Sequence, residues 1–412
     1  MGKDGMVIVG AGEAGSRAAV ALRENGWTGR ITLIGSEKHL PYERPPLSKQ
    51  FLTEDGEPVP ANILNENLIN ENNIELLVGR TVASFDREKH VVLLSDGSEL
   101  KFERMLLSTG AVPRELTLPG SGTSKVLYLR TIKDSWRIRQ QLKPGRHVAI
   151  IGGGFIGLEV AASAIKKGCD VTLVEAAPRI LMRGVPEEIA QMVEALHRSN
   201  GVRFQIGVPI REIHHDDNDF TISLENGQSI VCDAVIAGIG AIPETSIAKA
   251  NGLEIDNGIC VNEHLMTSDS DIFAAGDCCS FPHPLYGGRR VRLEAWRNAQ
   301  DQGIHAARNM LETPLPYNAI PWFWSDQYEQ TLQVAGLTDG YPIKIVRDLG
   351  RNGKMYFHLS RAYILKAVSC IGSFPGLSKE MRLAEMLIEK QATLQPEYIS
   401  NPSNSLKKLL RA

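Results

Sequence analysis

The feature that most constrains the fold of this chain is a spacing of three glycines that occurs twice. In the first copy, the apolar run Met6–Val9 leads into Gly10, Gly12 and Gly15, and a helical pattern follows. Glycine at these positions permits a tight turn, close approach of the backbone to a pyrophosphate, and close packing of helix on strand. Because the motif stands between a predicted strand and a predicted helix, it indicates a dinucleotide-binding turn. The next strand is expected at Ile31–Ile34.

The second copy begins at the predicted strand His147–Ile151 and runs through a helical pattern to the strand Val171–Val174. Glu175 ends that strand, 175 − 152 = 23 residues after the first glycine of the motif. An acid at this distance can accept hydrogen bonds from the ribose hydroxyls of a dinucleotide. The helix behind each motif supplies free N–H groups for phosphates. The glycines of the second copy are Gly152, Gly154 and Gly157.

A shared tail supports a duplication. TGAVP (Thr109–Pro113) follows the first motif and GAIP (Gly240–Pro243) the second, at intervals of 110 − 10 = 100 and 240 − 152 = 88 residues. We therefore expect an α/β protein with two Rossmann-like domains, one inserted into the other. From about Pro316 onward there is no glycine motif. Stretches that alternate apolar and polar residues predict strands, and Ser378–Gln391 has the spacing of a helix, so we expect a small α+β domain. The expected divisions are 1–112 and 243–315 for the first domain, 113–242 for the inserted domain, and 316–412 for the C-terminal domain.

Composition excludes several other classes of protein. The chain has 412 residues, with 45 Lys and Arg against 48 Asp and Glu, so its formal charge is 45 − 48 = −3. A nucleic-acid-binding protein would carry a basic excess, so no nucleic-acid partner is expected. The six cysteines form no CxxC pair, and no metal site is predicted. Apolar stretches such as Val235–Ile242 are far shorter than the roughly 18 residues of a membrane span. We expect a cytoplasmic protein with no membrane partner.

Four segments carry a family resemblance that covers essentially the whole chain. They are LPYERPPLSK (Leu40–Lys49), GGGFIGLE in the second glycine motif, IFAAGD (Ile272–Asp277) and PWFWSDQY (Pro321–Tyr328). With these segments the sequence resembles the flavin-dependent ferredoxin reductases of bacterial Rieske-type oxygenases and cytochromes P450. The resemblance implies a glutathione reductase-like fold, FAD on the first glycine motif, NADH on the second, and a C-terminal interface domain that caps the flavin. It also implies a [2Fe–2S] ferredoxin as the electron acceptor.

The resemblance further implies particular FAD contacts. Ala14 would lie at the pyrophosphate turn, and Val82 would hold the adenine through its backbone. Lys49 would lie beside the flavin, Asp277 would bond the ribityl chain, and Trp296 would face the pyrimidine end of the ring. The remaining nucleotide contacts expected in the chain are Arg44, Thr109, Gly110, Arg130, Gly240 and Gly276.

Two nucleotide assignments stay open. The family usually has an acid where this chain has Ser36, and Glu37 comes one residue later, so either residue could bind the adenosine ribose of FAD. At the second motif, a carboxylate at Glu175 accepts hydrogen bonds from both ribose hydroxyls and repels a 2′-phosphate, which favours NADH. Arg179 lies only four residues further on, so the strictness of this preference is undetermined.

Lys49 and Glu159 are the polar pair expected near flavin N5. A cation close to the ring favours the anionic reduced flavin, and Glu159, just after the third glycine of the second motif, could pair with that cation across the domain boundary. Hydride transfer needs close positioning of the two cofactors, so orientation is the main task of the protein. Either Trp322 or Trp324 would lie near the flavin or on the route to the ferredoxin, or both would be core residues.

Electrons are expected to leave directly from the flavin, because no cysteine precedes Cys169 and a dithiol relay is therefore absent. The neighbouring Cys278 and Cys279 are interpreted as structural.

Two other functions stay open: reduction of rubredoxin or a small-molecule acceptor, and a non-catalytic NADH-sensing flavoprotein that acts as an interaction module. A basic cluster could steer an acidic ferredoxin towards the protein; its members are Arg289, Arg290, Arg292 and Arg297.

Overall fold

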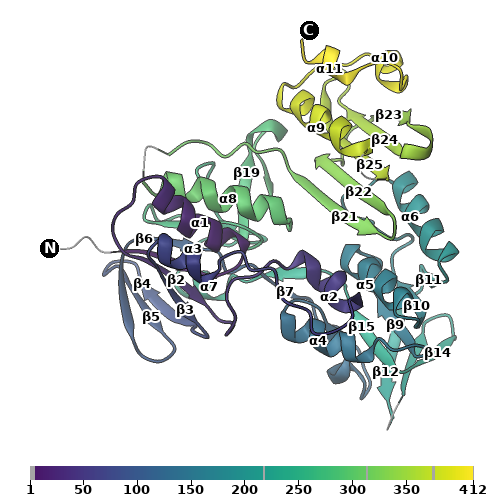
Figure 1. The fold of residues 1–412 in the computed structure, drawn as a ribbon, viewed down its shortest axis with the longest axis horizontal. Coiled ribbons are helices and arrows are strands. Elements are labelled where there is room, and N and C mark those ends of the chain that lie inside the picture. Colours follow the sequence, from purple (N-terminus) through teal and green to yellow (C-terminus); the bar gives the residue numbers. More distant parts are fainter. Residues whose placement is uncertain (1–4, 217–218, 312–313, 374–375, 412) are drawn as a thin grey trace. The chain divides into compact units, whose positions relative to one another are not determined.

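A computed structural model describes residues 5–216, 219–311, 314–373 and 376–411 (Figure 1). The chain divides into two compact units, which are described one at a time. The first comprises Met1–Glu43, Pro60–Val112 and Ala241–Ala319, and the second comprises Arg44–Val59, Pro113–Gly240 and Ile320–Ala412. The predicted domain boundaries at 113–242 and 316–412 stay predictions.

The first unit is built on a sheet whose parallel strands lie in the order β3-β2-β1-β6-β18. Because β1 pairs with β2 on one side and with β6 on the other, the strand order reverses beside β1. Ligands bind open α/β sheets at such a switch point, outside the carboxyl ends of the strands. The strands are β1 (Gly5–Val9), β2 (Ile31–Gly35), β3 (Ile74–Val78), β6 (Glu99–Leu107) and β18 (Ile272–Ala274). The sheet continues with β5 (Val91–Leu94), antiparallel to β6, and then β4 (Val82–Asp86), antiparallel to β5.

Two helices of the first unit lie side by side, α1 (Glu13–Glu24) and α8 (Trp296–Asn309) (Figure 1). A Cβ at Gly303 would stand 2.2 Å from the carbonyl oxygen of Ala14, so a glycine is needed for this close approach. The smaller elements are α3 (Glu66–Glu71), α7 (Ser246–Ala250), β7 (Ala111–Pro113) paired with β16 (Ala241–Pro243), and a sheet of β17 (Ile259–Cys260), β19 (Cys279–His283) and β20 (Arg289–Val291).

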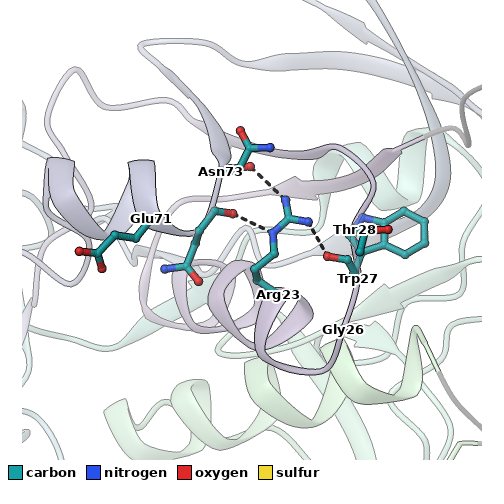
Figure 2. Close-up of a pocket in the computed structure, with 7 residues that line it drawn as sticks. Arg23, Gly26, Trp27, Thr28, Glu71 and Asn73 are labelled. Carbon is teal, nitrogen blue, oxygen red and sulfur yellow. Dashed lines mark hydrogen bonds between the residues drawn. The ribbon is translucent and has the colours of Figure 1, made fainter.

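A hollow in the first unit is lined by Arg23, near the end of α1, and by residues of the turns after α1 and before β3 (Figure 2). Its Nε donates to the carbonyl of Asn72 at 2.8 Å, and its Nη2 donates to that of Asn73 at 3.1 Å. Its Nη1 donates to the carbonyls of Trp27 and Gly29. The guanidinium therefore fastens α1 to the turn before β3.

The second unit contains a five-stranded parallel sheet in the order β11-β10-β9-β15-β8. Val148 and Ile150 of β9 are completely buried in a core that also includes Leu158 and Leu173. The sheet consists of β8 (Leu127–Tyr128), β9 (His147–Ile151), β10 (Asp170–Glu175), β11 (Arg203–Ile206) and β15 (Ala234–Ala237). Three antiparallel strands accompany it: β12 (Ile210–His215), β13 (Phe220–Leu224) and β14 (Ser229–Cys232). The helices are the 3₁₀ segment η1 (Pro45–Ser48), α2 (Gln50–Thr53), α4 (Ile132–Gln141), α5 (Phe155–Lys166) and α6 (Glu187–Ser199).

The C-terminal part of the second unit is a five-stranded antiparallel sheet with α9 packed against β25 (Figure 1). Buried Arg347 of β23 donates to the carbonyls of Ile399, Asn401, Pro402 and Asn404 at 2.7–3.1 Å, which fixes the chain end beside this sheet. The elements are β21 (Trp322–Gln327), β22 (Gln330–Gly336), β23 (Ile343–Asp348), β24 (Lys354–Leu359), β25 (Leu365–Gly372), α9 (Gly376–Glu389), α10 (Pro396–Ser400) and α11 (Leu406–Leu409).

The predicted α/β class is confirmed, and the strand His147–Ile151 has the predicted bounds. The helical pattern predicted after the first glycine motif is α1, which begins at Glu13 with Gly12 as its N-cap. In the part of the chain that the structure describes, no helix is both long and apolar enough to cross a membrane.

Replacing Arg347 with methionine should lower the free energy of unfolding by about 3 kcal/mol, because four backbone carbonyl groups lose their charged donor and Glu380 loses its ion-pair partner. The matched control is the exposed Arg351→Met, which should change it by less than about 0.5 kcal/mol. Urea unfolding followed by tryptophan fluorescence measures both. Equal stability of the two variants would contradict the role given to Arg347.

Candidate active site

The first glycine turn connects β1 to α1, and the space around its three glycines differs. Gly10 has φ +113°, and a Cβ there would lie 2.1 Å from the carbonyl oxygen of Ser108. A Cβ on Gly15 would lie 2.0 Å from the carbonyl oxygen of Gly10. In contrast, a Cβ on Gly12 would meet nothing within 4 Å. The turn is therefore tight on the sheet side and open in front of the helix N-terminus.

The residues at this turn fit the diphosphate of a dinucleotide such as FAD. Gly12 caps α1 without a side-chain hydrogen bond, so it leaves the first-turn N–H groups to a ligand. The adjoining turn after β18 contains Gly276, whose N–H donates to Oε1 of the buried Gln302 at 2.8 Å. Among the described residues, Nε2 of Gln302 has no hydrogen-bond acceptor, which leaves a buried donor for an absent group. Ala14 lies beside Gly276, 3.2 Å from a Cβ built there.

Most of the other predicted FAD contacts also lie in the first unit. Ser36 is exposed directly after β2, whereas the carboxylate of Glu37 accepts a 2.6 Å hydrogen bond from the Tyr42 hydroxyl. After β6, the Thr109 hydroxyl donates to the Glu244 carbonyl at 2.5 Å, and Gly110 has φ +74°. Three more predicted contacts are placed by their elements: Val82 begins β4, Trp296 begins α8, and Asp277 follows Gly276.

Three predicted FAD contacts belong to the second unit: Arg44, Lys49 and Arg130. Arg44 precedes η1, and its Nη1 donates to the carbonyl of Arg130 at 2.5 Å. These two residues are therefore brought together. Their contact with a nucleotide stays a prediction.

The second glycine turn connects β9 to α5 and repeats the geometry of the first. Gly152 has φ +101°, and a Cβ there would stand 2.5 Å from the carbonyl oxygen of Gly238. A Cβ on Gly157 would stand 2.1 Å from the carbonyl oxygen of Gly152. Gly154 caps α5 without a side-chain hydrogen bond, and Gly240 lies after β15 with φ +109°. This turn also fits the diphosphate of a dinucleotide.

Glu175 ends β10, and both of its carboxylate oxygens are held beside this turn. The backbone N–H groups of Gly153 and Ala177 each donate to the carboxylate at 2.7 Å. Arg179 is used inside its own loop, where its guanidinium donates to the carbonyls of Ile180 and Leu181 at 3.0 and 2.9 Å. Glu175 is therefore held in place to accept hydrogen bonds from ribose hydroxyls, whereas the Arg179 guanidinium binds carbonyls of its own loop. This arrangement favours a nucleotide without a 2′-phosphate.

Lys49 and Glu159 form an ion pair in the second unit, with Nζ 3.4 Å from Oε1 of the carboxylate. Lys49 follows η1, whereas Glu159 lies in the first half of α5. The Glu159 side chain is 5% exposed, and Lys49 is 20% exposed, so the lysine covers the acid. Asp326 of β21 places a second carboxylate 3.6 Å from the same Nζ. The predicted ion pair is therefore present, with both residues in the second unit, and its place beside a flavin stays a prediction.

Two serines complete the surroundings of Glu159. Ser48 donates to Oε2 at 2.5 Å, and Ser325 of β21 donates to Oε1 at 2.6 Å. Complete burial raises the pKa of Glu159 above its usual value, whereas Lys49 and the two hydroxyls lower it. Burial therefore disfavours the charged carboxylate, which is stabilised by partners from two separate segments of the chain, Ser48–Lys49 and β21.

Sequence reasoning missed Ser48 and Ser325, although both lie inside the segments that carry the family resemblance. The period of a β-strand could have found Ser325, since successive side chains alternate between faces. In β21 the stacked rings of Trp322 and Trp324 lie 5.4 Å apart, and Trp324 has Lys49 Nζ 5.6 Å from its ring centre. Ser325 therefore points the other way, to Glu159.

The described cysteines are all free, and Cys278 and Cys279 are completely buried. Burial raises the pKa of both thiols, which keeps them protonated and unreactive.

In the predicted basic cluster, Arg290 donates to the Val261 and Ser280 carbonyls, and Arg292 donates to that of Asp277. These two arginines hold loops together. Within the described residues, no group of three or more His, Cys, Asp or Glu side chains could hold a metal ion.

Comparison with known proteins agrees with this geometry. Residues 4–303 match the family model of pyridine nucleotide-disulphide oxidoreductases, and residues 322–410 match that of the reductase C-terminal domain. The chain belongs to the pyridine nucleotide-disulphide oxidoreductases. It is accordingly an oxidoreductase.

Three relatives define its place within the family. The ferredoxin–NAD(+) reductase component of the anthranilate 1,2-dioxygenase system of Burkholderia cepacia is 37% identical, with 100% of each chain covered. The rubredoxin–NAD(+) reductase of Pseudomonas putida is 40% identical over 342 residues, which cover 83% of this chain and 89% of the relative. The crystal structure of the covalent putidaredoxin reductase–putidaredoxin complex matches with a TM-score of 0.92 and 36% identity, covering 100% of this chain and 99% of the other.

Glu175→Arg should shift the preference of the enzyme from NADH towards NADPH by at least about tenfold in kcat/KM. It removes charge-assisted hydrogen bonds to the ribose and adds a cation for the 2′-phosphate. Steady-state kinetics with both nucleotides measure the shift. The control, Asp170→Arg, places the same charge at the exposed opposite end of β10 and should leave the ratio unchanged. An unaltered ratio in Glu175→Arg would contradict the site.

Proposed function

We propose that this protein is an NADH:ferredoxin reductase that passes electrons from NADH, through FAD, to a [2Fe–2S] ferredoxin serving a Rieske-type oxygenase or a cytochrome P450. The observation that carries the proposal is the pair of dinucleotide turns in one chain, the second of them joined to a fixed ribose acid at Glu175. A chain with two such turns can bind an electron-donating and an electron-accepting nucleotide together. A cytoplasmic location stays a prediction.

The first turn, with Gly10, Gly12 and Gly15, is the proposed FAD diphosphate site, and the second turn is the proposed NADH site. Bound FAD would supply the ability to accept the two electrons of a hydride and to release them singly. Glu175 would fix the adenosine ribose of NADH. The backbone N–H groups at the starts of α1 and α5 would hold the two diphosphates.

Lys49 is the proposed cation beside the flavin, and Glu159 is the group that orients it. Lys49 can approach a negatively charged ring because its ammonium is partly exposed, whereas Glu159 holds it from the buried side. Asp326 holds the same ammonium from β21. Without these carboxylates, the long lysine side chain would sample several rotamers.

The relatives, and the number of electrons that each carrier exchanges, support a [2Fe–2S] ferredoxin as the electron acceptor. NADH gives two electrons at once, whereas a [2Fe–2S] centre takes one, so a flavin between them is required. The anthranilate system relative is a ferredoxin–NAD(+) reductase component, and this likeness covers the whole chain. The second candidate acceptor is rubredoxin, favoured by the likeness to a rubredoxin–NAD(+) reductase over a smaller part of the chain.

Steady-state turnover with matched concentrations of different acceptors tests the function. The FAD-loaded protein is supplied with NADH and, in separate reactions, with a [2Fe–2S] ferredoxin, a rubredoxin or monodehydroascorbate. We expect the fastest turnover with the ferredoxin. Faster turnover with rubredoxin would support the second candidate. Slow flavin reduction by NADH, with a long-lived charge-transfer complex, would instead indicate a sensing module and contradict both reductase assignments.

Lys49→Met should slow the anaerobic reduction of the flavin by NADH by at least about tenfold, because the developing negative charge on the ring loses its cation. Stopped-flow measurement of flavin bleaching gives the rate constant. Lys167→Met is the matched control, since Lys167 also pairs with an acid of the second unit, Asp55, at 3.6 Å. Equal rates in the two variants would remove Lys49 from the mechanism.

A further inference from the structure

A continuous chain of hydrogen bonds runs from Glu159 into the interior of the second unit. Ser325 donates to Glu159 Oε1 at 2.6 Å, and Gln327 Nε2 donates to the Ser325 hydroxyl at 2.8 Å. Oε1 of Gln327 lies 2.8 Å from Nε2 of His197, and Nδ1 of His197 lies 3.4 Å from the Tyr328 hydroxyl. Ser325, Gln327 and His197 are all completely buried.

The chemistry of these groups gives the chain one direction. The amide oxygen of Gln327 can only accept, so Nε2 of His197 must carry the hydrogen. Nδ1 of the neutral ring is then an acceptor, and the Tyr328 hydroxyl donates to it. The Gln327 amide donates to the Ser325 oxygen, which leaves the Ser325 hydrogen for Glu159. Every donor therefore points towards the carboxylate.

The two ends of the chain differ in their electrostatic surroundings. Glu159 faces Lys49 and the Ser48 hydroxyl as well as Ser325, and Asp326 lies beyond Lys49. The groups in direct contact with the His197 ring are uncharged. The Phe204 ring lies edge-on at 6.3 Å and the Tyr328 ring at 4.9 Å, and the nearby Arg198 guanidinium rests on Phe204. Burial lowers the pKa of His197 to about 4, so the ring stays neutral near pH 7.

We propose that His197 is a positioning residue that, through Gln327 and Ser325, keeps Glu159 ionised and directed at Lys49. His197 fixes which way the Gln327 amide faces, and the amide fixes which way the Ser325 hydroxyl donates. Without the His197 hydrogen, the amide and the hydroxyl could turn away, and Oε1 of Glu159 would lose its neutral donor. The effect on catalysis rests on the proposed function, whereas the direction of the chain does not.

The kinetic test is the pH dependence of anaerobic flavin reduction by NADH in the FAD-loaded protein. The step to follow is the one that Glu159→Gln removes. His197→Phe keeps an aromatic ring but has no donor, so the carboxylate is less stable and the midpoint of that step should rise by about one pH unit. His197→Gln restores an amide donor near the Nε2 position and should return the midpoint towards the wild-type value.

His358→Phe is the matched control. His358 is also buried in the second unit, its pKa is likewise lowered to about 4 by burial, and its Nε2 lies 3.0 Å from the Ser369 hydroxyl. That hydroxyl lies outside the chain to Glu159, so the midpoint should stay at the wild-type pH. An unshifted midpoint in His197→Phe, or an equal shift in His358→Phe, would overturn the proposal.

A second measurement uses the unaltered protein and needs no catalysis. Nitrogen-15 NMR of histidine-labelled protein reports which ring nitrogen of His197 carries the hydrogen, and His197→Phe assigns the signal by its loss. We expect the Nε2–H tautomer. The Nδ1–H tautomer would reverse the chain and overturn the proposal. If NADH does not reduce the flavin, the proposed function fails, and the tautomer still decides the direction of the chain.

Discussion

The ion pair and hydrogen bonds of the buried Glu159 carboxylate hold α5, η1 and β21 together in the second unit. The carboxylate is costly to remove from water, and it is tolerated because Lys49, Ser48 and Ser325 supply a charge and two hydroxyl groups. These partners come from η1, the residue after it, and β21, while Glu159 itself lies on α5. One acid thereby joins segments that are more than a hundred residues apart in the chain.

The two glycine turns show how similar local sterics serve different chemistry. In each, the first and third glycines avoid a carbonyl oxygen of neighbouring backbone, and the middle glycine opens the helix N-terminus. What differs is the acid near the end of the second strand, which is the last residue of β10 in one unit and lies two residues after β2 in the other. In the second unit Glu175 is held by two backbone N–H groups, whereas in the first unit Glu37 receives the Tyr42 hydroxyl. Nucleotide choice therefore depends on residues outside the glycine pattern.

The sequence was sufficient for the α/β class and for both turns, because spacing and motif context determine them locally. The Lys49–Glu159 pair joins distant positions and was expected only through the family resemblance. The sequence was insufficient for Ser325, Gln327 and His197, which meet only when β21 packs against α5 and α6. It also left Arg179 undecided, since its role depends on carbonyls exposed by the folding of its own loop. Local patterns thus predict where a cofactor binds, whereas buried polar partners require the tertiary structure.

In the proposed reaction, two electrons enter from NADH together and leave one at a time. Anaerobic double-mixing stopped flow can follow both steps: the FAD-loaded protein is mixed with one equivalent of NADH and then with excess oxidised [2Fe–2S] ferredoxin. We expect rapid bleaching of the flavin, followed by reduction of two ferredoxins for each NADH as the flavin colour returns. Bleached flavin that persists in the presence of each of several oxidised [2Fe–2S] ferredoxins would contradict the proposed reaction.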